Sequence, residues 1–352
     1  MSSSIPKAVL YCAPNSIWSA VALLTLYEKG YGDDEVDLRV VDISTGENFS
    51  PTFLRLNPKA TVPTLVVPLQ NTLGPDTESR YKAITDTKSV VEFLDKSRSA
   101  ISRTNTTSSA PAPALAPATI AFSDASSKII DSILHSEGAS PSTLLYMNAR
   151  DDASLQVLAK AFVPFLTSRQ QALEGYISEA ASGSSPISEK TKAFWKDKKA
   201  ATETLLDIMI HADKTSAQLD QASRLERDDY FTNARTCWEV ELKESLVKLN
   251  SQITGPYSLG DQISISDLHL AAWLARIVAL SGGRMNDEGD IAITKVESHI
   301  GPEFHFVRDF AAIPAAGGAP GGLPLHQSKL AAFWDAMRER SSFKKVYCNG
   351  LY

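Results

Sequence analysis

The chain has 352 residues, 43% of them apolar, which is enough for two or three domains of about 150 residues each and excludes a disordered chain. Its 35 lysines and arginines stand against 41 aspartates and glutamates, and the formal net charge of −6 argues against non-specific nucleic-acid binding. The three cysteines, Cys12, Cys237 and Cys348, match neither a disulfide framework nor a zinc pattern, which favours a reducing, cytoplasmic setting.

No stretch of the sequence predicts a secretory signal peptide or a membrane span. The residues before Pro14 are too few and too polar for the apolar core of a signal peptide. The most apolar window, residues 268–280, contains His269 and Arg276, which a spanning helix would have to place in lipid. We therefore expect a soluble, intracellular protein that has no membrane partner.

The first part of the chain alternates predicted strands and helices. Short apolar runs rich in β-forming residues predict strands over 7–11, 36–43, 64–69 and 81–85. Helical spacing predicts helices that begin after Asn15 or Ser16, at Ser50-Pro51 and after Asp86. Because strands and helices alternate, a parallel strand pair is favoured, and residues 1–97 form one α/β domain.

The rest of the chain is predicted to be helical. Residues 98–122, rich in serine, threonine, alanine and proline, predict a linker or exposed loop. Residues 123–352 are predicted to form an all-helical domain with insertions, among them the flexible or surface segments 183–186 and 315–324. Apolar periodicity predicts helices over 129–134, 155–181, 191–249 with one interruption, 265–280 and 330–340.

Val62-Pro63 stands immediately before a predicted strand, where proline is unusual because it lacks the N–H of the strand ladder. A cis bond would resolve this, and it would turn the N–H and C=O of Val62 outward as an open edge for a short peptide. Considered alone, an ordinary trans-proline turn is the alternative, since cis occurs in only about 5–6% of X-Pro bonds.

Five stretches of the chain are considered together: APNSIWSAVALLTLYEKG, GENFSPTFLRLNPKATVPTL, ITDTKSVVEFLD, SLGDQISISDLHLAAWLARI and FWDAMRERSSFKKV. In this order and at this spacing the sequence resembles the cytosolic glutathione transferases, over the whole first domain and two parts of the second. The resemblance implies a thioredoxin-like α/β N-terminal domain that binds glutathione and an all-α C-terminal domain that supplies most of the second-substrate pocket. It further implies a homodimer and a role in detoxification.

Carried over residue by residue, the resemblance assigns glutathione-binding positions. Val62, before Pro63, corresponds to the backbone partner of the cysteinyl unit. Asp86 and Thr87 occupy the place of the family's Glu-Ser pair: helix N–H groups and the Thr87 hydroxyl can donate to the γ-glutamyl α-carboxylate, and Asp86 can accept from its ammonium. A plain N-cap role for Asp86 is compatible with this. Weaker candidates for glutathione's carboxylates, with simple solvation as the alternative, are Lys59, Asn48 and Lys7.

The predicted chemistry needs an ionised glutathione thiol. A free thiol has a pKa of about 8.5, and ionising it at neutral pH takes about 1.4–2.7 kcal/mol, which one charged hydrogen bond at a helix start supplies. Ala13 stands where cysteine- and serine-type members carry their catalytic side chain. The string Ala13-Pro14-Asn15 instead resembles the fungal nitrogen-regulator type, whose asparagine amide faces the sulfur. Asn15 and Ser16 are the predicted donors, with Ser19 behind them; helix capping alone is the alternative.

Other polar motifs are predicted to be structural. Ser264 and Asp267 form a capping-box pattern at the start of an apolar helix, and the resembling family uses this pair as a folding element. Cys12 is predicted to be a buried small apolar residue rather than a mixed-disulfide nucleophile. Four residues of types that can bind a metal lie close together in the sequence: Glu297, His299, Glu303 and His305. We predict no metal site there, because residues 301–302, Gly-Pro, interrupt their spacing and no zinc pattern results.

The sequence thus predicts a glutathione-dependent transferase or lyase, in which the glutathione thiolate attacks an electrophilic carbon of a small hydrophobic substrate by substitution, addition or ether cleavage. Pocket-lining aromatic residues are expected among Tyr146, Phe165, Tyr230 and Trp238. One alternative is a non-catalytic, glutathione-transferase-like binding or regulatory protein, which Ala13 motivates. Another is a ganglioside-induced-differentiation-type relative, although those are tail-anchored and this chain ends FKKVYCNGLY.

Overall fold

The computed structural model describes residues 7–69, 81–99, 107–183, 186–311 and 326–352. The chain divides into two compact units, each assembled from three segments. The first unit comprises Met1–Ser16, Asp33–Val90 and Tyr146–Arg235; the second comprises Ile17–Gly32, Val91–Leu145 and Thr236–Tyr352. The predicted boundaries at residues 97 and 122 remain a prediction, because the units group segments by contact rather than by position in the chain.

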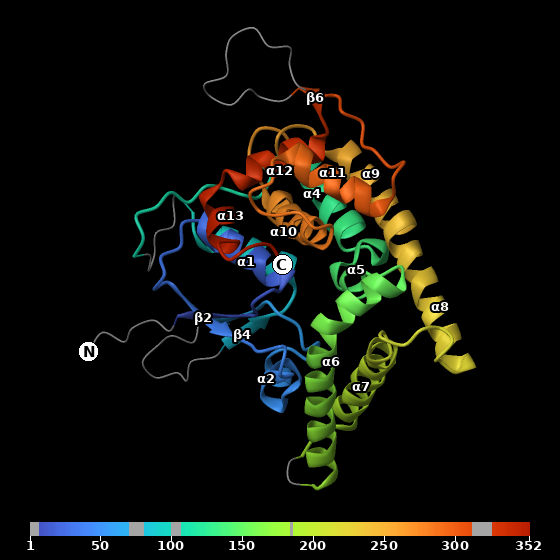
Figure 1. The fold of residues 1–352 in the computed structure, drawn as a ribbon. Coiled ribbons are helices and arrows are strands. Elements are labelled where there is room, and N and C mark those ends of the chain that lie inside the picture. The colour runs from blue at the N-terminus through green and yellow to red at the C-terminus, as the bar shows by residue number, and fades with distance from the viewer. Residues whose placement is uncertain (1–6, 70–80, 100–106, 184–185, 312–325) are drawn as a thin grey trace, which may run out of the picture. The chain divides into compact units, whose positions relative to one another are not determined.

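The N-terminal elements follow one another as a thioredoxin-like βαβαββα arrangement (Figure 1). They are β1 (Ala8–Cys12), α1 (Ile17–Glu28), β2 (Val36–Val40), the 3-10 turn η1 (Glu47–Phe49), α2 (Pro51–Leu56), β3 (Thr64–Pro68), β4 (Tyr81–Ile84) and α3 (Thr87–Ser97). All four predicted strands and the three helices predicted between and after them are confirmed. The α/β class of this part of the chain is therefore confirmed as well.

The remaining elements are helical except for one two-stranded ribbon. They are α4 (Ile120–Ser127), the π-helix η3 (Lys128–Leu134), η4 (Glu137–Ala139), α5 (Pro141–Tyr146), α6 (Asp152–Ala181), α7 (Glu189–Ile210), α8 (Gln221–Arg235), η5 (Thr236–Leu242), α9 (Lys243–Gln252), α10 (Ile265–Leu280), α11 (Gly289–Ile300), β5 (Phe310–Ala311), β6 (His326–Gln327), α12 (Lys329–Arg338) and α13 (Ser341–Val346). Within the described residues, no helix is long and apolar enough to cross a membrane.

Each predicted helix is present, and α4, α5, α11 and α13 are additional to the prediction. The predicted helix over 191–249 is interrupted between α7 and α8, as expected, and then runs through η5 and α9. Helix α11 was not predicted, because the glycines and prolines around it mask an apolar face at helical spacing. That face consists of Ala292, Ile293, Val296 and Ile300. The predicted loop over 315–324 falls outside the described residues.

The first unit contains a four-stranded sheet with the order β2-β1-β3-β4. β1 pairs parallel with β2, as the alternation of strands and helices predicted, and β3 pairs antiparallel with both β1 and β4. In this register Tyr11 lies opposite Thr64, and Leu65 lies opposite Ile84. Consequently the end of β1, the start of β3 and the end of β4 lie at the same end of the sheet.

Helices α6 and α7 run side by side in the first unit and are tied to the turn η1 (Figure 1). Trp195 of α7 is fully buried, and its indole Nε1 donates to the Phe49 carbonyl at 2.9 Å. The Tyr176 ring of α6 stacks on Trp195 at a centroid distance of 5.5 Å. A buried indole that finds a backbone acceptor is a stable anchor, so η1 is held in place against the α6–α7 pair.

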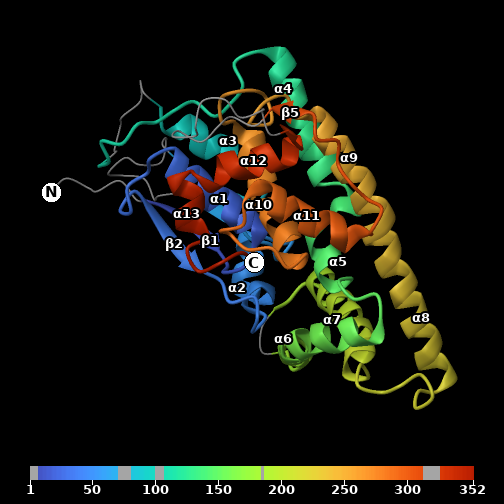
Figure 2. The same ribbon diagram turned by 45° about the horizontal axis from the view of Figure 1, so that its top comes forward.

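The second unit is built around α10, which lies beside α1, with α13 also packed on α1 (Figure 2). Every residue of α10 from Ile265 to Val278 is buried. This is the buried central helix that the apolar residues around its whole circumference predicted.

Asp267 closes the N-terminus of α10, as the capping-box pattern predicted. Its carboxylate accepts hydrogen bonds from the Ser264 N–H at 2.7 Å, the Ser264 hydroxyl at 2.7 Å and the Ser258 N–H at 2.6 Å. The carboxylate is fully buried, and burial raises the pKa of Asp267, an effect that the Ser264 and Ser258 donors oppose. The pair therefore connects the helix start to the preceding loop.

We predict that Asp267→Asn lowers the free energy of unfolding by about 1–3 kcal/mol, because an amide can accept from only one of the two backbone N–H groups and turns a donor toward the other. Urea unfolding followed by circular dichroism measures this. Asp261→Asn, at an exposed position in the preceding loop, is the control and should leave the unfolding midpoint unchanged. An unchanged midpoint for Asp267→Asn would show that the capping contacts contribute nothing.

The described part of the predicted linker, residues 107–122, is mostly exposed but is held by hydrogen bonds, among them those around Leu115. Leu115 is buried, and its N–H donates to Asp95 Oδ1 at 3.0 Å. The same carboxylate pairs with Lys29 Nζ at 2.9 Å, and Lys29 also donates to the Pro113 carbonyl. Because a buried ion pair offers donors and an acceptor to passing backbone, this segment packs although its composition predicts an exposed loop.

Candidate functional site

Three predicted site segments meet at one end of the sheet in the first unit. Residues 13–16 follow β1, residues 62–63 precede β3, and residues 85–87 follow β4. The register of β3 with β1 and β4 places these segments at the same end. Side chains and peptide groups from three distant parts of the sequence are therefore available to one ligand.

The peptide before β3 presents an open main-chain edge. The Val62-Pro63 bond is cis, as predicted. Val62 is partly buried and Pro63 is buried. With the residues that the structure describes, neither the N–H nor the C=O of Val62 makes a hydrogen bond. An extended peptide could use both groups, which is the way short peptides add to a sheet edge.

Two buried asparagines hold the loop that leads to Val62. Asn57 is fully buried, and its Nδ2 donates to the Thr61 carbonyl at 2.8 Å and to the Thr64 hydroxyl at 3.1 Å. Asn48 Nδ2 donates to the Ala60 carbonyl at 2.9 Å. Sequence reasoning missed Asn57, although an asparagine directly before a proline in a turn is a detectable signal. Both residues position the loop.

The weaker candidates for carboxylate binding have different surroundings. The amide nitrogen of Asn48 is already used on Ala60, and its buried Oδ1, which makes no hydrogen bond within the described residues, is an acceptor that a carboxylate would repel. Lys59 is exposed. Lys7 is half-exposed, with its Nζ 3.9 Å from Asp37 Oδ1. Lys59 is the candidate whose charge is available without rearrangement.

Asp86 and Thr87 stand at the N-terminus of α3. Asp86 is exposed, and its Oδ1 accepts from the Ser89 N–H at 2.9 Å, so Asp86 caps the helix as its alternative reading predicted. Thr87 is 8% exposed, and its hydroxyl makes no hydrogen bond with any described residue. The first-turn N–H groups and this hydroxyl form the kind of donor set that binds a carboxylate at a helix start.

The turn after β1 brings the two predicted thiolate donors to the start of α1. The Ser16 N–H donates to the Ala13 carbonyl at 3.3 Å, and α1 begins at Ile17. Asn15 has a φ of +61°, in the left-handed region that asparagine tolerates better than most residues. Asn15 is exposed and Ser16 partly buried, whereas Ala13 is 4% exposed. The two polar side chains are thus the accessible ones in this turn.

Cys12, at the end of β1, lies next to this turn but is 7% exposed, as predicted. Burial raises the pKa of the Cys12 thiol, so its thiolate is scarcer than that of a free cysteine at the same pH. Burial, together with Glu241, also raises the pKa of the Cys237 thiol. Cys348 is exposed.

We predict that, at pH 8, iodoacetamide labels Cys348 rapidly and labels Cys12 and Cys237 at least about tenfold more slowly, because alkylation needs the accessible thiolate. Mass spectrometry of the digested native protein measures the three rates. Unfolding in urea should make them similar, which is the internal control. Rapid native labelling of Cys12 would contradict its burial and would make it a competing nucleophile.

The four aromatic residues expected to line a pocket fall into two groups. Tyr230 and Trp238 belong to the cores: Tyr230 is 3% exposed and Trp238 fully buried, and the Trp238 indole donates to the Leu144 carbonyl at 3.3 Å. These two rings fill the interior, so the expectation that some of the four line a pocket is confined to the other two. Tyr146 and Phe165 are partly buried in the first unit.

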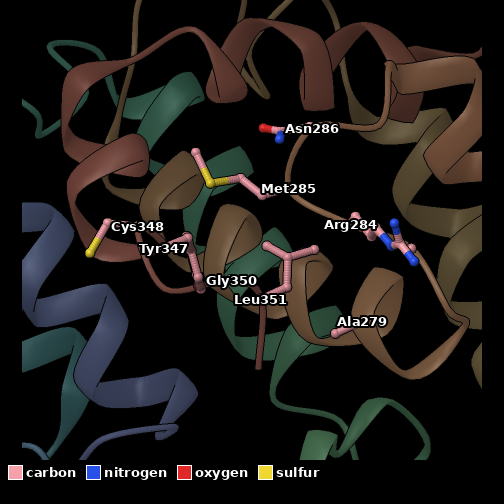
Figure 3. Close-up of a pocket in the computed structure, with 9 residues that line it drawn as sticks. Ala279, Arg284, Met285, Asn286, Tyr347, Cys348, Gly350 and Leu351 are labelled. Carbon is pink, nitrogen blue, oxygen red and sulfur yellow. The ribbon is translucent and has the colours of Figure 1, made fainter.

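The second unit contains a cavity of about 510 Å³ between the turn after α10 and the C-terminal residues (Figure 3). Met285 and Asn286 lie on one side and Leu351 on the other. No residue predicted from the sequence as a site residue lines it.

Acidic and histidine side chains do not converge on a metal position in the part of the chain that the structure describes. The Glu297 carboxylate is buried and is used internally: it pairs with the Arg308 guanidinium at 2.9 Å and accepts from the Phe306 N–H at 2.7 Å. The His299 ring packs edge-on against Trp238 at 4.6 Å. These contacts assign structural roles to Glu297 and His299.

Comparison with known proteins agrees with the strand order. Residues 15–97 match the family described as Glutathione S-transferase, N-terminal domain. A search of curated proteins found no match. Among solved structures, the chain is similar to the β-etherase LigF from Sphingobium sp. strain SYK-6, with 16% identity, a TM-score of 0.49 and coverage of 98% of this chain and 100% of that chain.

Two further solved structures show the same order of likeness. Gtt2 from Saccharomyces cerevisiae has 14% identity, a TM-score of 0.45 and coverage of 96% of this chain and 99% of that chain. A glutathione transferase homolog from sulfitobacter, solved with bound glutathione, has 15% identity, a TM-score of 0.39 and coverage of 97% and 98%. The fold assignment itself rests on the strand order and on the family match of residues 15–97.

Proposed function

We propose that this glutathione-transferase-like chain is a glutathione-dependent transferase or lyase whose glutathione site is the end of the sheet in the first unit. The observation that carries the proposal is the unused main-chain edge of Val62 beside the start of α3. A tripeptide with a free α-carboxylate needs both features: an extended edge for its backbone and clustered N–H donors for its carboxylate. The family match of residues 15–97 supports the choice of tripeptide.

In this proposal the chain orients glutathione and stabilises its thiolate, and the sulfur is the nucleophile. The Val62 N–H and C=O hold the cysteinyl backbone, while Thr87 and the first turn of α3 hold the γ-glutamyl carboxylate. Asn15 and Ser16, at the accessible side of the turn after β1, donate to the sulfur. The thiolate attacks an electrophilic carbon, a carbon–sulfur bond forms, and in a substitution the leaving group departs with the electron pair.

We predict that Thr87→Val weakens glutathione binding by about 10- to 100-fold, because the α-carboxylate loses one charge-assisted hydrogen bond while the side-chain shape is kept. Isothermal titration with glutathione measures the dissociation constant. Thr87→Ser retains the hydroxyl and should bind within about threefold of the unchanged protein. Ser89→Ala removes an exposed hydroxyl from the same turn and serves as the matched control. If the unchanged protein does not bind glutathione, the site assignment is wrong.

A non-catalytic glutathione-binding protein is the second candidate function, and the buried Ala13 in the place of a catalytic side chain favours it. The two functions differ in turnover rather than in binding. Release of a chromophoric thioether from chlorodinitrobenzene, or cleavage of a model β-aryl ether, distinguishes them. Tight glutathione binding without turnover on either substrate would favour the binding protein.

A further inference from the structure

Arg169 of α6 is a partly buried cation without an anionic partner. Its guanidinium carbon lies 5.0 Å from the centroid of the Phe49 ring. Within the described residues no carboxylate forms an ion pair with Arg169, and its buried Nε makes no hydrogen bond. The polar side chain that faces it is Tyr146.

Three other arginines of the described residues show the hydrogen-bond acceptors that a buried guanidinium normally has. The usual arrangement here is a guanidinium that donates to several acceptors, as Arg98 does to three carbonyls, Arg227 to a carboxylate and two carbonyls, and Arg308 to Glu297. Withdrawing a charge from water without such partners is unfavourable. Burial lowers the pKa of Arg169, and the Tyr146 hydroxyl only partly offsets this.

The contact with Phe49 uses none of the N–H groups of Arg169; within the described residues, the Tyr146 hydroxyl hydrogen-bonds to the guanidinium and the buried Nε makes no hydrogen bond. A ring under the guanidinium interacts with its flat face, whereas the five N–H groups point outward in its plane. A planar carboxylate pairs with that edge through two parallel hydrogen bonds. Neither an ammonium in place of the guanidinium nor a hydroxyl in place of the carboxylate can form this pair of bonds. The N–H groups that do not face Tyr146, the buried Nε among them, therefore fit a carboxylate better than any neutral group.

An aromatic surface continues from Arg169 along α6. Phe162, Phe165 and Arg169 are spaced by three, four and seven residues and therefore share one helix face. The Phe162 ring packs edge-on against Tyr146 at 5.4 Å and against Phe165 at 6.3 Å, and all three aromatic residues are partly buried. Arg169 also contacts Phe49, which directly follows Asn48, one of the two asparagines that hold the loop leading to Val62.

We propose that Arg169 binds a ligand carboxylate and so selects aromatic electrophiles that carry a carboxylate group. The inference rests on the proposed glutathione-dependent function for its chemistry but not for the binding itself. The ring of the electrophile lies on the aromatic face of α6, and its carboxylate pairs with the guanidinium edge. The glycyl carboxylate of glutathione is the other source of the same chemistry, and the experiment separates the two.

The experiment compares matched substrates. The neutral probe is 1-chloro-2,4-dinitrobenzene, and the acidic probe is 4-chloro-3,5-dinitrobenzoate. In both, the glutathione thiolate forms a carbon–sulfur bond, the carbon–chlorine bond breaks, and chloride leaves with its electron pair. The variants are Arg169→Gln, Arg169→Lys and, as a matched loss of charge at an exposed position of the same unit, Arg55→Gln.

Arg169→Gln should raise KM for the acidic electrophile by about 10- to 100-fold and should leave KM for the neutral probe within about twofold. Arg169→Lys should recover part of this loss. Arg55→Gln should change KM for neither substrate. If glutathione's glycyl carboxylate is the partner, Arg169→Gln instead raises KM for glutathione with both probes, and the unchanged protein loses affinity for the glycyl ethyl ester. Either result supports a carboxylate site at Arg169. Unchanged constants for both substrates overturn it.

A binding measurement keeps this test separate from the proposed function. The non-reacting pair 3,5-dinitrobenzoate and 1,3-dinitrobenzene is titrated calorimetrically without glutathione. Weaker binding of the benzoate to Arg169→Gln, in a protein that binds no glutathione, would retain the carboxylate site and overturn only the transferase. Binding of the benzoate that is indifferent to Arg169, in a protein that does turn over glutathione, would overturn only the inference.

Discussion

Replacing Asp95 with alanine is expected to lower the free energy of unfolding by about 3–5 kcal/mol. Asp95 is 6% exposed and Lys29 is 1% exposed, and their charged atoms lie 2.9 Å apart. Asp95 also accepts from the N–H groups of Leu115 and Ala116. Removing the carboxylate leaves a buried ammonium and two backbone donors without their acceptor. Urea unfolding followed by circular dichroism and by tryptophan fluorescence measures the change.

A double variant separates the cost of leaving Lys29 without its carboxylate from the net contribution of the Lys29–Asp95 pair to stability. Lys29→Met combined with Asp95→Leu removes both charges and should be less destabilised than Asp95→Ala alone. Glu189→Gln breaks the exposed pair with Lys192 and should leave the unfolding midpoint unchanged. If Asp95→Ala unfolds at the same urea concentration as the unchanged protein, the buried network does not stabilise the fold.

Removing the thiolate donor is expected to lower kcat at neutral pH by about 10- to 100-fold, because a loss of about 1.4–2.7 kcal/mol of stabilisation raises the pKa of the thiol by one to two units and lowers the thiolate fraction accordingly. Asn15→Gly deletes the amide while keeping a residue that adopts the φ of +61° without strain, and Ser16→Ala deletes the hydroxyl. The variant that carries the effect should also shift the pH–rate profile upward, toward the pKa of about 8.5 of a free thiol.

The pH profile is the decisive measurement because a structural role would not move it. Glutathione should still bind to the affected variant, since Val62 and Thr87 are unchanged, so its dissociation constant and the ultraviolet absorbance of bound thiolate are measured together. A loss of thiolate absorbance without a loss of binding is the expected result. If both variants keep the rate and the profile of the unchanged protein, neither Asn15 nor Ser16 stabilises the sulfur.

Local sequence patterns predicted the elements of the fold closely. The second helix, Pro51–Leu56, begins at the predicted residues, because Ser50 caps it and proline occupies its first position. Ser264 and Asp267 likewise predicted the start of α10, because a capping box involves residues only three positions apart. The packing of residue 115 was not predicted, because Asp95 of α3, which accepts from its N–H, and the ion-pair partner Lys29 lie far away in the chain.

Some residues of the candidate site were likewise predicted from the sequence, and others were not. The resemblance to the glutathione transferases indicated Val62, Asp86 and Thr87, and the sheet register brings their segments to one end of the sheet. The pair Asn57-Pro58 signals a turn, but no local pattern showed that the Asn57 side chain is buried or that Arg169 is more than a solvated helix charge. What sets them apart is burial and the presence or absence of a partner.

By itself, then, the sequence determined the order and type of the elements and the residues at their ends, because propensity, capping and periodicity depend on neighbours within a few positions. Only the tertiary structure decided which polar side chains are buried and which of those find a partner. Burial removes water from a charge, and the partners that replace the water come from residues that only folding brings near. Asp95 is paired with Lys29 in this way, whereas the buried Nε of Arg169 has no hydrogen-bond partner within the described residues.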